Sequence, residues 1–299
     1  MEGMTMFFAP MPLEQADAPF DNDDFLFEPK IDGQRLELAF IQGRTHLFTR
    51  HGNDVTRQYP ELHFVPVADG HDVVLDGEVA YVNPENGLIQ FEPLMQRVRM
   101  KKKSQINDAK SRIPVRYFVF DILYYNGEDL RDQPLSARKE LLANVMTGNQ
   151  YFKLMTAQHR RGTALFQAAK QLQLDGIVGK RKSSPYIELP SDNWQTINIY
   201  HPAEVSFVGY RKHRFGWLFR NASGTINGVI EHPVSHASQE TFLELTKPYI
   251  SGEDRNHVYL EAAIKGRIRF RSGTRNGMVR LPELIEIGSS NPNRSISMH

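Results

Sequence analysis

At 299 residues the chain exceeds the size at which a single hydrophobic core usually keeps growing, so two domains are expected. Hydrophobic residues make up 40% and charged residues 24%, as in ordinary soluble globular proteins, and the absence of cysteine excludes disulfides, cysteine-ligated zinc and thiol catalysis. With a net charge of +1, total charge alone gives no indication of a nucleic-acid partner.

The first strongly patterned stretch is residues 28–35, Glu-Pro-Lys-Ile-Asp-Gly-Gln-Arg, which follows a strand-like Phe-Leu-Phe at 25–27. Lysine is a poor nucleophile at its free pKa of about 10.4, but neighbouring cations or desolvation lower that value and free the amine to attack phosphorus. Lys30 is therefore a candidate nucleophile. Gly33 is expected to adopt a backbone conformation closed to other residues, and Arg35 offers a charged fork to a phosphate or ribose oxygen. The alternative is a surface turn with ordinary charges.

A β-hairpin is predicted next. Residues 36–40 alternate apolar and polar side chains, Gln42-Gly43 is typical of a turn, and residues 45–50 return as a second strand. Lys30 would thus sit at the edge of a rigid sheet. Arg50 ends the hairpin and, taken alone, is an ordinary surface arginine.

Residues 73–79 predict a buried strand that is interrupted by acids, the last of which is Glu78. A carboxylate at the end of such a strand suits a ribose hydroxyl or a divalent ion, because hard cations prefer oxygen donors; the alternative is a turn acid.

Residues 91–99 predict an amphipathic helix with Arg97 off its apolar face. The basic run that continues to Lys110 predicts an exposed loop, either merely solvated or in contact with a polyanion.

The apolar run 115–125 predicts a buried strand, and an aromatic such as Phe120 within it belongs by default to the core. Pro134 is expected at the start of a helix, where its missing N–H costs nothing. Residues 162–174 predict an amphipathic helix that leads into Asp175.

After about residue 200 the sequence becomes strand-rich. Strands are predicted at 204–210, 217–220, 228–231 and 267–271, with one helix at 238–245. Short strands with a single helix in about ninety residues favour a five-stranded OB barrel, a fold that commonly holds nucleic acid. The row Lys265, Arg267, Arg269 and Arg271 would add positive charge to it.

The pattern of residues 28–35 resembles the Glu-x-Lys-x-Asp-Gly-x-Arg nucleotidyl-transfer motif of ATP-dependent polynucleotide ligases, especially DNA ligases of bacterial end-joining systems. Further motifs of that family are matched in the family's order, so that the resemblance covers roughly residues 5–287. The matching segments are residues 49–62, 73–79, 118–121, 134–139, 175–180 and 270–282.

The resemblance implies a reaction with ATP and Mg²⁺, or Mn²⁺, in which Lys30 attacks the α-phosphate and carries AMP to the 5′-phosphate of a nick. The 3′-hydroxyl then displaces AMP and joins the strands. The residues that the resemblance places in the nucleotide pocket are Glu28 at adenine, Arg35 and Glu78 on the ribose side, Phe120 on the base face, and Lys180. It assigns the metal to Glu78 and Asp175.

The same resemblance gives three arginines a role at DNA. Arg50 would hold the 5′-phosphate at the nick, and Arg275 and Arg280 belong to a last motif that moves over the active site and then away from it. The expected partners are ATP and nicked double-stranded DNA.

One departure from the family pattern affects the α-phosphate site. The family's fifth motif is Trp-x-Lys-x-Lys, but the sequence here reads Trp-Gln-Thr-Ile-Asn, with Thr196 and Asn198 in place of the two lysines. Losing two charges beside a transferring phosphoryl group removes transition-state stabilisation. Lys180, Arg181 or Lys182 is expected to supply the missing charge; the alternative is impaired adenylylation in a protein that binds nicks or seals activated ends.

We therefore expect an α+β fold: an adenylation domain with antiparallel sheets and flanking helices over residues 1–200, an OB domain over 201–290, and a flexible tail over 291–299. No apolar run approaches the roughly 18 residues of a membrane span, and a signal-peptide pattern is lacking. The expectation is a monomer without membrane association, cytoplasmic and bound to the nucleoid.

Two rival functions remain. An RNA ligase or a capping guanylyltransferase shares the lysine motif, although the Arg50 segment and the last motif favour DNA ligase. A catalytically idle module that binds nicks or ends is suggested by Thr196 and Asn198. Labelling with ATP or GTP and sealing of RNA would separate these alternatives.

Overall fold

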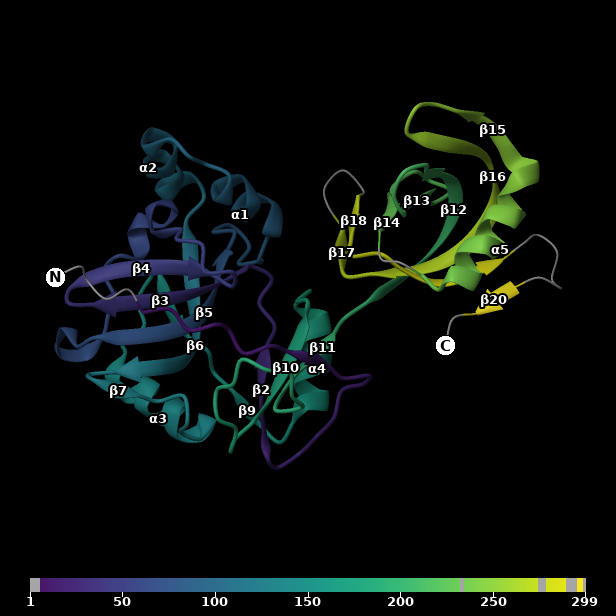
Figure 1. Cartoon of the computed structure of the whole chain (residues 1–299). Helices are drawn as coiled ribbons and strands as arrows, with labels where there is room; N and C mark the ends of the chain where they lie inside the picture. Colours follow the sequence, from purple (N-terminus) through teal and green to yellow (C-terminus); the bar gives the residue numbers. More distant parts are fainter. Residues whose placement is uncertain (1–5, 232–233, 274–277, 289–294, 298–299) are drawn as a thin grey trace. The chain divides into compact units, whose positions relative to one another are not determined.

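The computed structural model describes residues 6–231, 234–273, 278–288 and 295–297 (Figure 1). The chain divides into two compact units, Met1–Asn198 and Ile199–His299, here called the first and the second unit. Each has a hydrophobic core of its own. Among the described helices, none has the length and apolar character needed to cross a bilayer.

One sheet of the first unit has the strand order β4–β3–β5–β6–β7, and β8 adds to β6 in parallel. Its strands are β3 (Gln34–Ile41), β4 (Arg44–Thr49), β5 (Val73–Tyr81), β6 (Val115–Tyr125), β7 (Glu128–Asp129) and β8 (Phe152–Leu154). The predicted hairpin is confirmed: Gln42 and Gly43 have φ values of 50° and 74° between β3 and β4. Positive φ at both turn residues matches the right-handed twist of the strands.

The other sheet of the first unit has the order β1–β11–β10–β2–β9. Its strands are β1 (Glu14–Gln15), β2 (Phe25–Pro29), β9 (Gln158–His159), β10 (Gly176–Arg181) and β11 (Trp194–Asn198). The chain crosses from this sheet to the six-stranded one between β2 and β3, so residues 30–33 form the link between the two sheets.

In the described part of the first unit, four α-helices and three short 3-10 helices accompany these sheets. They are α1 (Phe91–Val98), α2 (Lys103–Arg112), α3 (Leu135–Val145), α4 (Gly162–Gln171), η1 (Thr56–Gln58), η2 (Pro60–Leu62) and η3 (Ala68–Gly70). The helices α1, α3 and α4 confirm the predicted helical segments, and Pro134 caps α3 as expected. Helix α3 packs on β6, and α4 packs on β2 and β10.

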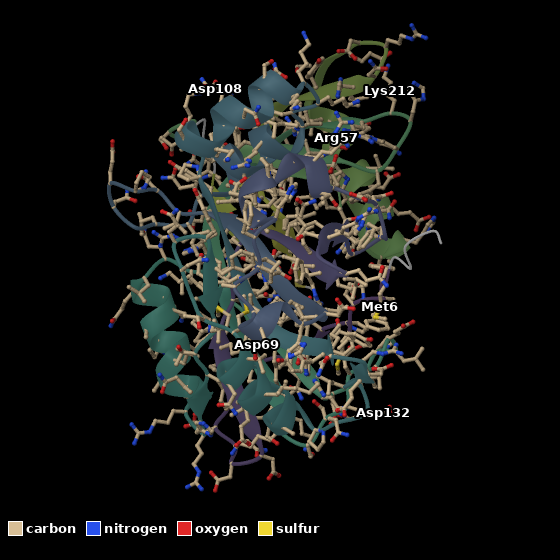
Figure 2. The ribbon with its side chains drawn as sticks, turned by 90° about the vertical axis from the view of Figure 1, so that its left-hand side faces the viewer. Met6, Arg57, Asp69, Asp108, Asp132 and Lys212 are labelled. Atoms are coloured by element: carbon tan, nitrogen blue, oxygen red, sulfur yellow. The ribbon has the colours of Figure 1, made fainter. Side chains whose placement is uncertain are left out.

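Two predictions around the basic run were wrong. The segment expected as a loop contains the helix α2, because Ile106 and Ala109 supply a buried stripe on an otherwise polar sequence. Asp108 of α2 lies at the surface of the first unit (Figure 2).

Arg97, expected off the apolar face of α1, is fully buried and ion-paired with Glu61, because α1 is covered on that side as well.

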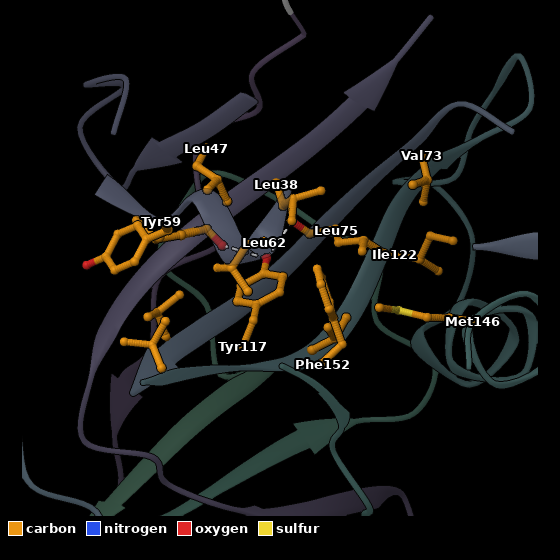
Figure 3. Packing of buried hydrophobic residues seen from close by; sticks show 14 of the residues in the cluster. Leu38, Leu47, Tyr59, Leu62, Val73, Leu75, Tyr117, Ile122, Met146 and Phe152 are labelled. Carbon is orange, nitrogen blue, oxygen red and sulfur yellow. Dashed lines mark hydrogen bonds between the residues drawn. The ribbon is translucent and has the colours of Figure 1, made fainter. Parts of the chain in front are cut away.

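Two hydrophobic clusters fill the described part of the first unit. One is shown in Figure 3, where Tyr117 donates its hydroxyl hydrogen to the backbone carbonyls of Leu36 (2.8 Å) and Leu75 (3.1 Å). The other contains Leu26 of β2, Trp194 of β11 and residues of β3 and β5. This second cluster therefore joins the two sheets.

The second unit is built on one antiparallel sheet with the strand order β14–β13–β12–β16–β19–β20, to which β15 adds at β16. Its elements are β12 (His201–Arg211), β13 (Trp217–Arg220), β14 (Asn227–Ile230), α5 (His236–Thr246), η4 (Lys247–Tyr249), β15 (Ile250–Glu253), β16 (His257–Phe270), β17 (Ser272–Gly273), β18 (Val279–Arg280), β19 (Glu283–Gly288) and β20 (Ser295–Ser297). The predicted strands and the helix are confirmed in position. Trp217 and Phe242 stack at its centre with ring centroids 3.9 Å apart.

The fold class is mixed α+β and rich in sheet, as predicted. The described part of the expected tail differs from expectation, since Ser295–Ser297 pair with β19 as strand β20. The rest of that tail, 291–294 and 298–299, lies outside the described residues.

Candidate active site

A cavity of about 850 Å³ opens in the first unit where its two sheets meet. Its walls come from residues 10–13, the link between β2 and β3, both sheets and the start of α1. Six side chains predicted for a nucleotide pocket line this cavity: Glu28, Lys30, Arg35, Glu78, Phe120 and Lys180. Residues that are far apart in the sequence are thus brought to one place.

Lys30 stands where the chain leaves β2. Its backbone N–H donates to the carbonyl of Gly176 (2.9 Å), and its Nζ lies 3.7 Å from Oδ2 of Asp175. Asp175, just before β10, thereby holds the side chain of Lys30, and Gly176, the first residue of β10, holds its backbone. The lysine is fixed at the sheet edge but remains about one-fifth exposed to the cavity.

The reason predicted for Gly33 was wrong. Its φ is not in the left-handed region, but an added Cβ would lie 2.2 Å from the carbonyl oxygen of Val79 and 2.9 Å from Cγ of Glu78. Glycine is therefore required because β5 approaches too closely for any side chain.

Glu28 is buried between two lysines. Its carboxylate is paired with Nζ of Lys139, which α3 supplies, and with Nζ of Lys180 at 2.8 Å. Burial opposes ionisation, but the two ammonium groups outweigh it and hold the pKa of Glu28 below its ordinary value. The expected adenine-recognition group is thus a charged carboxylate that is engaged at both oxygens.

Lys180 also contacts the aromatic wall of the cavity. Its Nζ lies 4.0 Å from the ring centroids of both Phe120 and Trp194, which is the geometry of cation–π contact. Burial lowers the pKa of Lys180 to about 8, although Glu28 opposes the shift. An ammonium therefore lies against the ring predicted to stack on adenine.

Arg35, whose guanidinium was expected to bind a phosphate or ribose oxygen, is engaged by other groups of the protein. Its Nε and Nη2 donate to the two carboxylate oxygens of Asp76 (3.0 and 2.6 Å), and its Nη1 donates to the carbonyl of Met11 (2.7 Å). The hydroxyl of Tyr186 donates to the same carboxylate (2.7 Å). The guanidinium lines the cavity, but most of its donors are already used to hold other segments in place.

Glu78 and Asp175, the predicted metal ligands, both interact electrostatically with Lys30. Burial raises the pKa of Glu78 to about 8, against the opposing charges of Arg35 and Lys30. Within the described residues, no cluster of three acidic or histidine side chains forms a metal cage. Two carboxylates suit Mg²⁺ that brings phosphate and water as its other ligands.

Thr196 and Asn198 lie on the cavity side of β11. In the register of the sheet, Thr196 lies beside Val178, which in turn lies beside Glu28, and both of these line the cavity. Thr196 Oγ1 donates to Asn198 Oδ1 (3.0 Å), and Asn198 Nδ2 donates to Gln15 (3.3 Å). The positions of the two substituted lysines therefore share the sheet face of Trp194, Val178 and Glu28, as side-chain alternation on a strand requires, although neither Thr196 nor Asn198 lines the cavity itself.

Of the three cations proposed to replace those lysines, Lys180 alone lines the cavity among the described residues. Arg181 pairs with Asp192 at 3.1 Å, and Lys182 donates to the carbonyl of Asp23 (2.5 Å). Both are thereby held on other surfaces of the first unit.

The structure describes two of the three arginines that were predicted to bind DNA. Arg50 lines the cavity and donates from Nε to Nε2 of His51 (3.0 Å). Arg280 lies on β18 in the second unit, with Nη1 3.3 Å from the hydroxyl of Ser272. Arg275 lies outside the described residues.

Two of the four cations in the row predicted on the second unit are paired with acids. Arg267 pairs with Glu286 at 3.0 Å and Arg269 with Glu283 at 2.6 Å, across the ladder between β16 and β19. The alternating cations on β16 gave no information about the acids on the neighbouring strand β19. This face is less positive than the sequence suggested.

Sequence reasoning gave no role to Lys139, to residues 10–13 or to the Trp194 ring in the cavity wall. Trp194 belonged to a quoted motif, and Lys139 follows the arginine of another. Residues 10–13 carried no pattern beyond two prolines.

Comparison with known proteins found related sequences and similar folds. A family model described as "ATP dependent DNA ligase domain" matches residues 10–195. The SPbeta prophage-derived DNA ligase-like protein LigB of Bacillus subtilis is 34% identical over 278 residues, which are 93% of this chain and 97% of that protein.

A probable DNA ligase of Dictyoglomus turgidum is 32% identical over 200 residues, 62% of this chain, but the match spans only 34% of that longer protein. Among solved structures, mycobacterial DNA ligase D complexed with ATP and MES has a TM-score of 0.56 at 21% identity, covering 97% of this chain and 98% of that one. The last likeness concerns the fold alone.

Proposed function

The chain belongs to the ATP-dependent DNA ligase family, and from this premise we propose that it seals nicks in double-stranded DNA through an adenylate carried on Lys30. Lys30 Nζ attacks the α-phosphorus of ATP, a P–N bond forms as the bond to pyrophosphate breaks, and the amine loses a proton. The AMP passes to the 5′-phosphate of the nick, and the 3′-hydroxyl displaces it to make the phosphodiester. The position of Lys30 in the cavity wall beside Asp175 carries this proposal.

The nucleotide base is assigned to the region of Glu28 and Phe120. Because both carboxylate oxygens of Glu28 are paired with lysines, we propose that a base binding at this carboxylate displaces one of the two. Lys180 is the mobile partner in this proposal, since it also covers the Phe120 ring and could move toward the phosphates. Lys139 then remains to keep the Glu28 carboxylate ionised.

Glu78 and Asp175 would hold Mg²⁺ or Mn²⁺, whose positive charge would offset charge developing on the leaving pyrophosphate. Arg35 acts on the ribose side mainly by holding Asp76 and residue 11 in place. With Thr196 and Asn198 in the fifth motif, Lys180 is the cation left to stabilise the α-phosphate, so a slower first step is expected.

The second unit is proposed to be an OB-fold domain that closes on duplex DNA, with the first unit as the adenylation domain. Its antiparallel sheet, the helix α5 and its separate aromatic core support that assignment. Arg50 is proposed to hold the 5′-phosphate, and Arg275 and Arg280 to act in the movement of this unit. The enzyme is proposed to work as a cytoplasmic monomer on nucleoid DNA.

The test is labelling with α-labelled ATP and Mg²⁺, followed by a chase with nicked duplex DNA. Wild-type protein should become labelled and pass the label to DNA, whereas Lys30→Ala should do neither, and chelation of the metal should prevent labelling. GTP and nicked RNA serve as parallel substrates that should not react. Absence of label together with failure to seal a pre-adenylated nick would leave the idle nick-binding alternative, which Thr196 and Asn198 suggest.

A further inference from the structure

One wall of the cavity comes from a segment that precedes every motif quoted above. Pro10, Met11, Pro12 and Leu13 line the cavity, and they belong to residues 6–16, here called the strap. Met11 is fully buried. A segment with almost no regular secondary structure thus forms a packed wall of the proposed nucleotide site.

The strap is fastened at several points to both sheets. At its start, Phe7 packs on Phe48 with ring centroids 5.5 Å apart, and the Phe8 N–H donates to both carboxylate oxygens of Glu37 at 3.0 Å. In its middle, Arg35 binds the carbonyl of Met11. At its end, β1 pairs with β11 in parallel.

Glu37, which accepts the hydrogen bonds from Phe8, is unusual because it is a buried acidic side chain. It is 2% exposed and lies directly beside Asp76 in the ladder between β3 and β5, and Asp76 in turn lies beside Asp121 of β6. The other two acids of this row are each paired with an arginine, Asp76 with Arg35 and Asp121 with Arg138.

The charge state of Glu37 follows from its surroundings. Burial raises its pKa to about 9; the neighbouring Asp76 adds to the rise, and the Phe8 N–H, Arg131 and Arg35 oppose it. At neutral pH the side chain is therefore an uncharged acid that accepts a hydrogen bond from the strap. A glutamine would have the same shape and the same acceptor.

We propose that Glu37 is a positioning residue that latches the strap against the cavity and thereby sets the affinity of the enzyme for ATP. This inference rests on the proposed function, because it takes the cavity to be the ATP site. Glu37 touches no reacting atom. Without its acceptor, the partly buried Phe8 N–H would lose its hydrogen-bond partner, a cost that favours release of the strap.

The experiment measures self-adenylylation as a function of ATP concentration for wild type, Glu37→Leu and Glu37→Gln. Glu37→Leu should raise the KM for ATP about tenfold, equivalent to about 1.4 kcal/mol, with the maximal rate changed less. Glu37→Gln should restore the wild-type KM. Met146→Ala, which removes a buried side chain from the other cluster of the first unit, is the control for general destabilisation and should leave KM unchanged.

A second reaction separates this inference from the proposed function. Sealing of a pre-adenylated nick needs no ATP, so Glu37→Leu should seal it at nearly the wild-type rate. If wild-type protein shows no labelling and no sealing, the proposed function fails and this inference falls with it. If wild type is active but Glu37→Leu has the wild-type KM, only the latch is overturned.

Hydrogen exchange on the wild-type chain tests the strap even if Glu37→Leu does not fold. Binding of α,β-methylene-ATP, which cannot transfer AMP, should slow amide exchange in residues 8–13 because the nucleotide packs against that wall. Unchanged exchange in this segment at saturating analogue would overturn the assignment of the strap to the ATP site.

Discussion

Asn198 lies directly opposite Gly176 in the ladder between β10 and β11, and Gly176 follows the carboxylate that holds Lys30. By the alternation of side chains on β11, a lysine at position 198 would project from the same sheet face as Trp194 and Glu28, which line the cavity. Positions 196 and 198 lie two residues apart on the same strand. Cations at these two positions would be able to reach the α-phosphate.

Restoring the two lysines should accelerate the first step. We expect Thr196→Lys with Asn198→Lys to raise the maximal rate of self-adenylylation about tenfold, since one well-placed donor at a developing charge is worth about 2.7–4 kcal/mol elsewhere and part of that is already supplied by Lys180. The measurement is single-turnover labelling at saturating ATP. Thr196→Met with Asn198→Met controls for length without charge, and an equal effect of both pairs would contradict the electrostatic explanation.

Arg50 should discriminate between nicks with and without a 5′-phosphate. Arg50→Gln keeps a polar side chain but removes the charge, so affinity for the phosphorylated nick should fall about tenfold, corresponding to loss of one charge-assisted contact. Affinity for a nick with a 5′-hydroxyl should stay unchanged, as measured by fluorescence anisotropy at fixed salt. A parallel loss on both nicks would assign Arg50 to general duplex binding.

Lys139 should stabilise the ionised form of Glu28. Lys139→Met leaves Glu28 with Lys180 alone and should lower the free energy of unfolding at pH 7 by about 2 kcal/mol, less than breaking a buried pair completely. Because the pKa of Glu28 is lowered in the folded chain, the stabilisation exists above its ordinary value of 4.5 and is lost as pH falls through the folded value. Urea unfolding at pH 7 and pH 3.5 should show the difference between the two proteins shrinking in acid.

Glu37 should make the first unit less stable as pH rises. The folded chain keeps a proton on Glu37 up to about pH 9, whereas the unfolded chain releases it near the ordinary value of 4.5. Stability from this group is therefore complete below about pH 4.5 and declines by up to about 1.4 kcal/mol per pH unit until the folded pKa is passed. Glu37→Gln lacks this decline, so its unfolding free energy should match wild type near pH 4 and exceed it increasingly at pH 7 and pH 9. Parallel pH profiles would show that Glu37 is already ionised in the folded chain.

The sequence by itself determined the elements that depend on neighbouring residues. The Gln42-Gly43 turn, the strands on either side of it and the helix opened by Pro134 follow from local backbone preferences and from the period of apolar side chains. Lys30 at the end of β2 was predictable for the same reason, since a strand-like run leads directly into it.

Only the tertiary structure decided which partners those residues meet. Glu28 lies between Lys139 and Lys180, Arg35 is engaged by Asp76, and Glu37 holds the strap. Each of these pairs joins segments distant in the sequence, and their meeting depends on strand register and on how two sheets pack. The period of the apolar residues indicates which face of an element is buried. A buried charge interrupts that period, and the sequence does not show which residue it pairs with. For that reason Arg97 was misplaced and the strap was not foreseen.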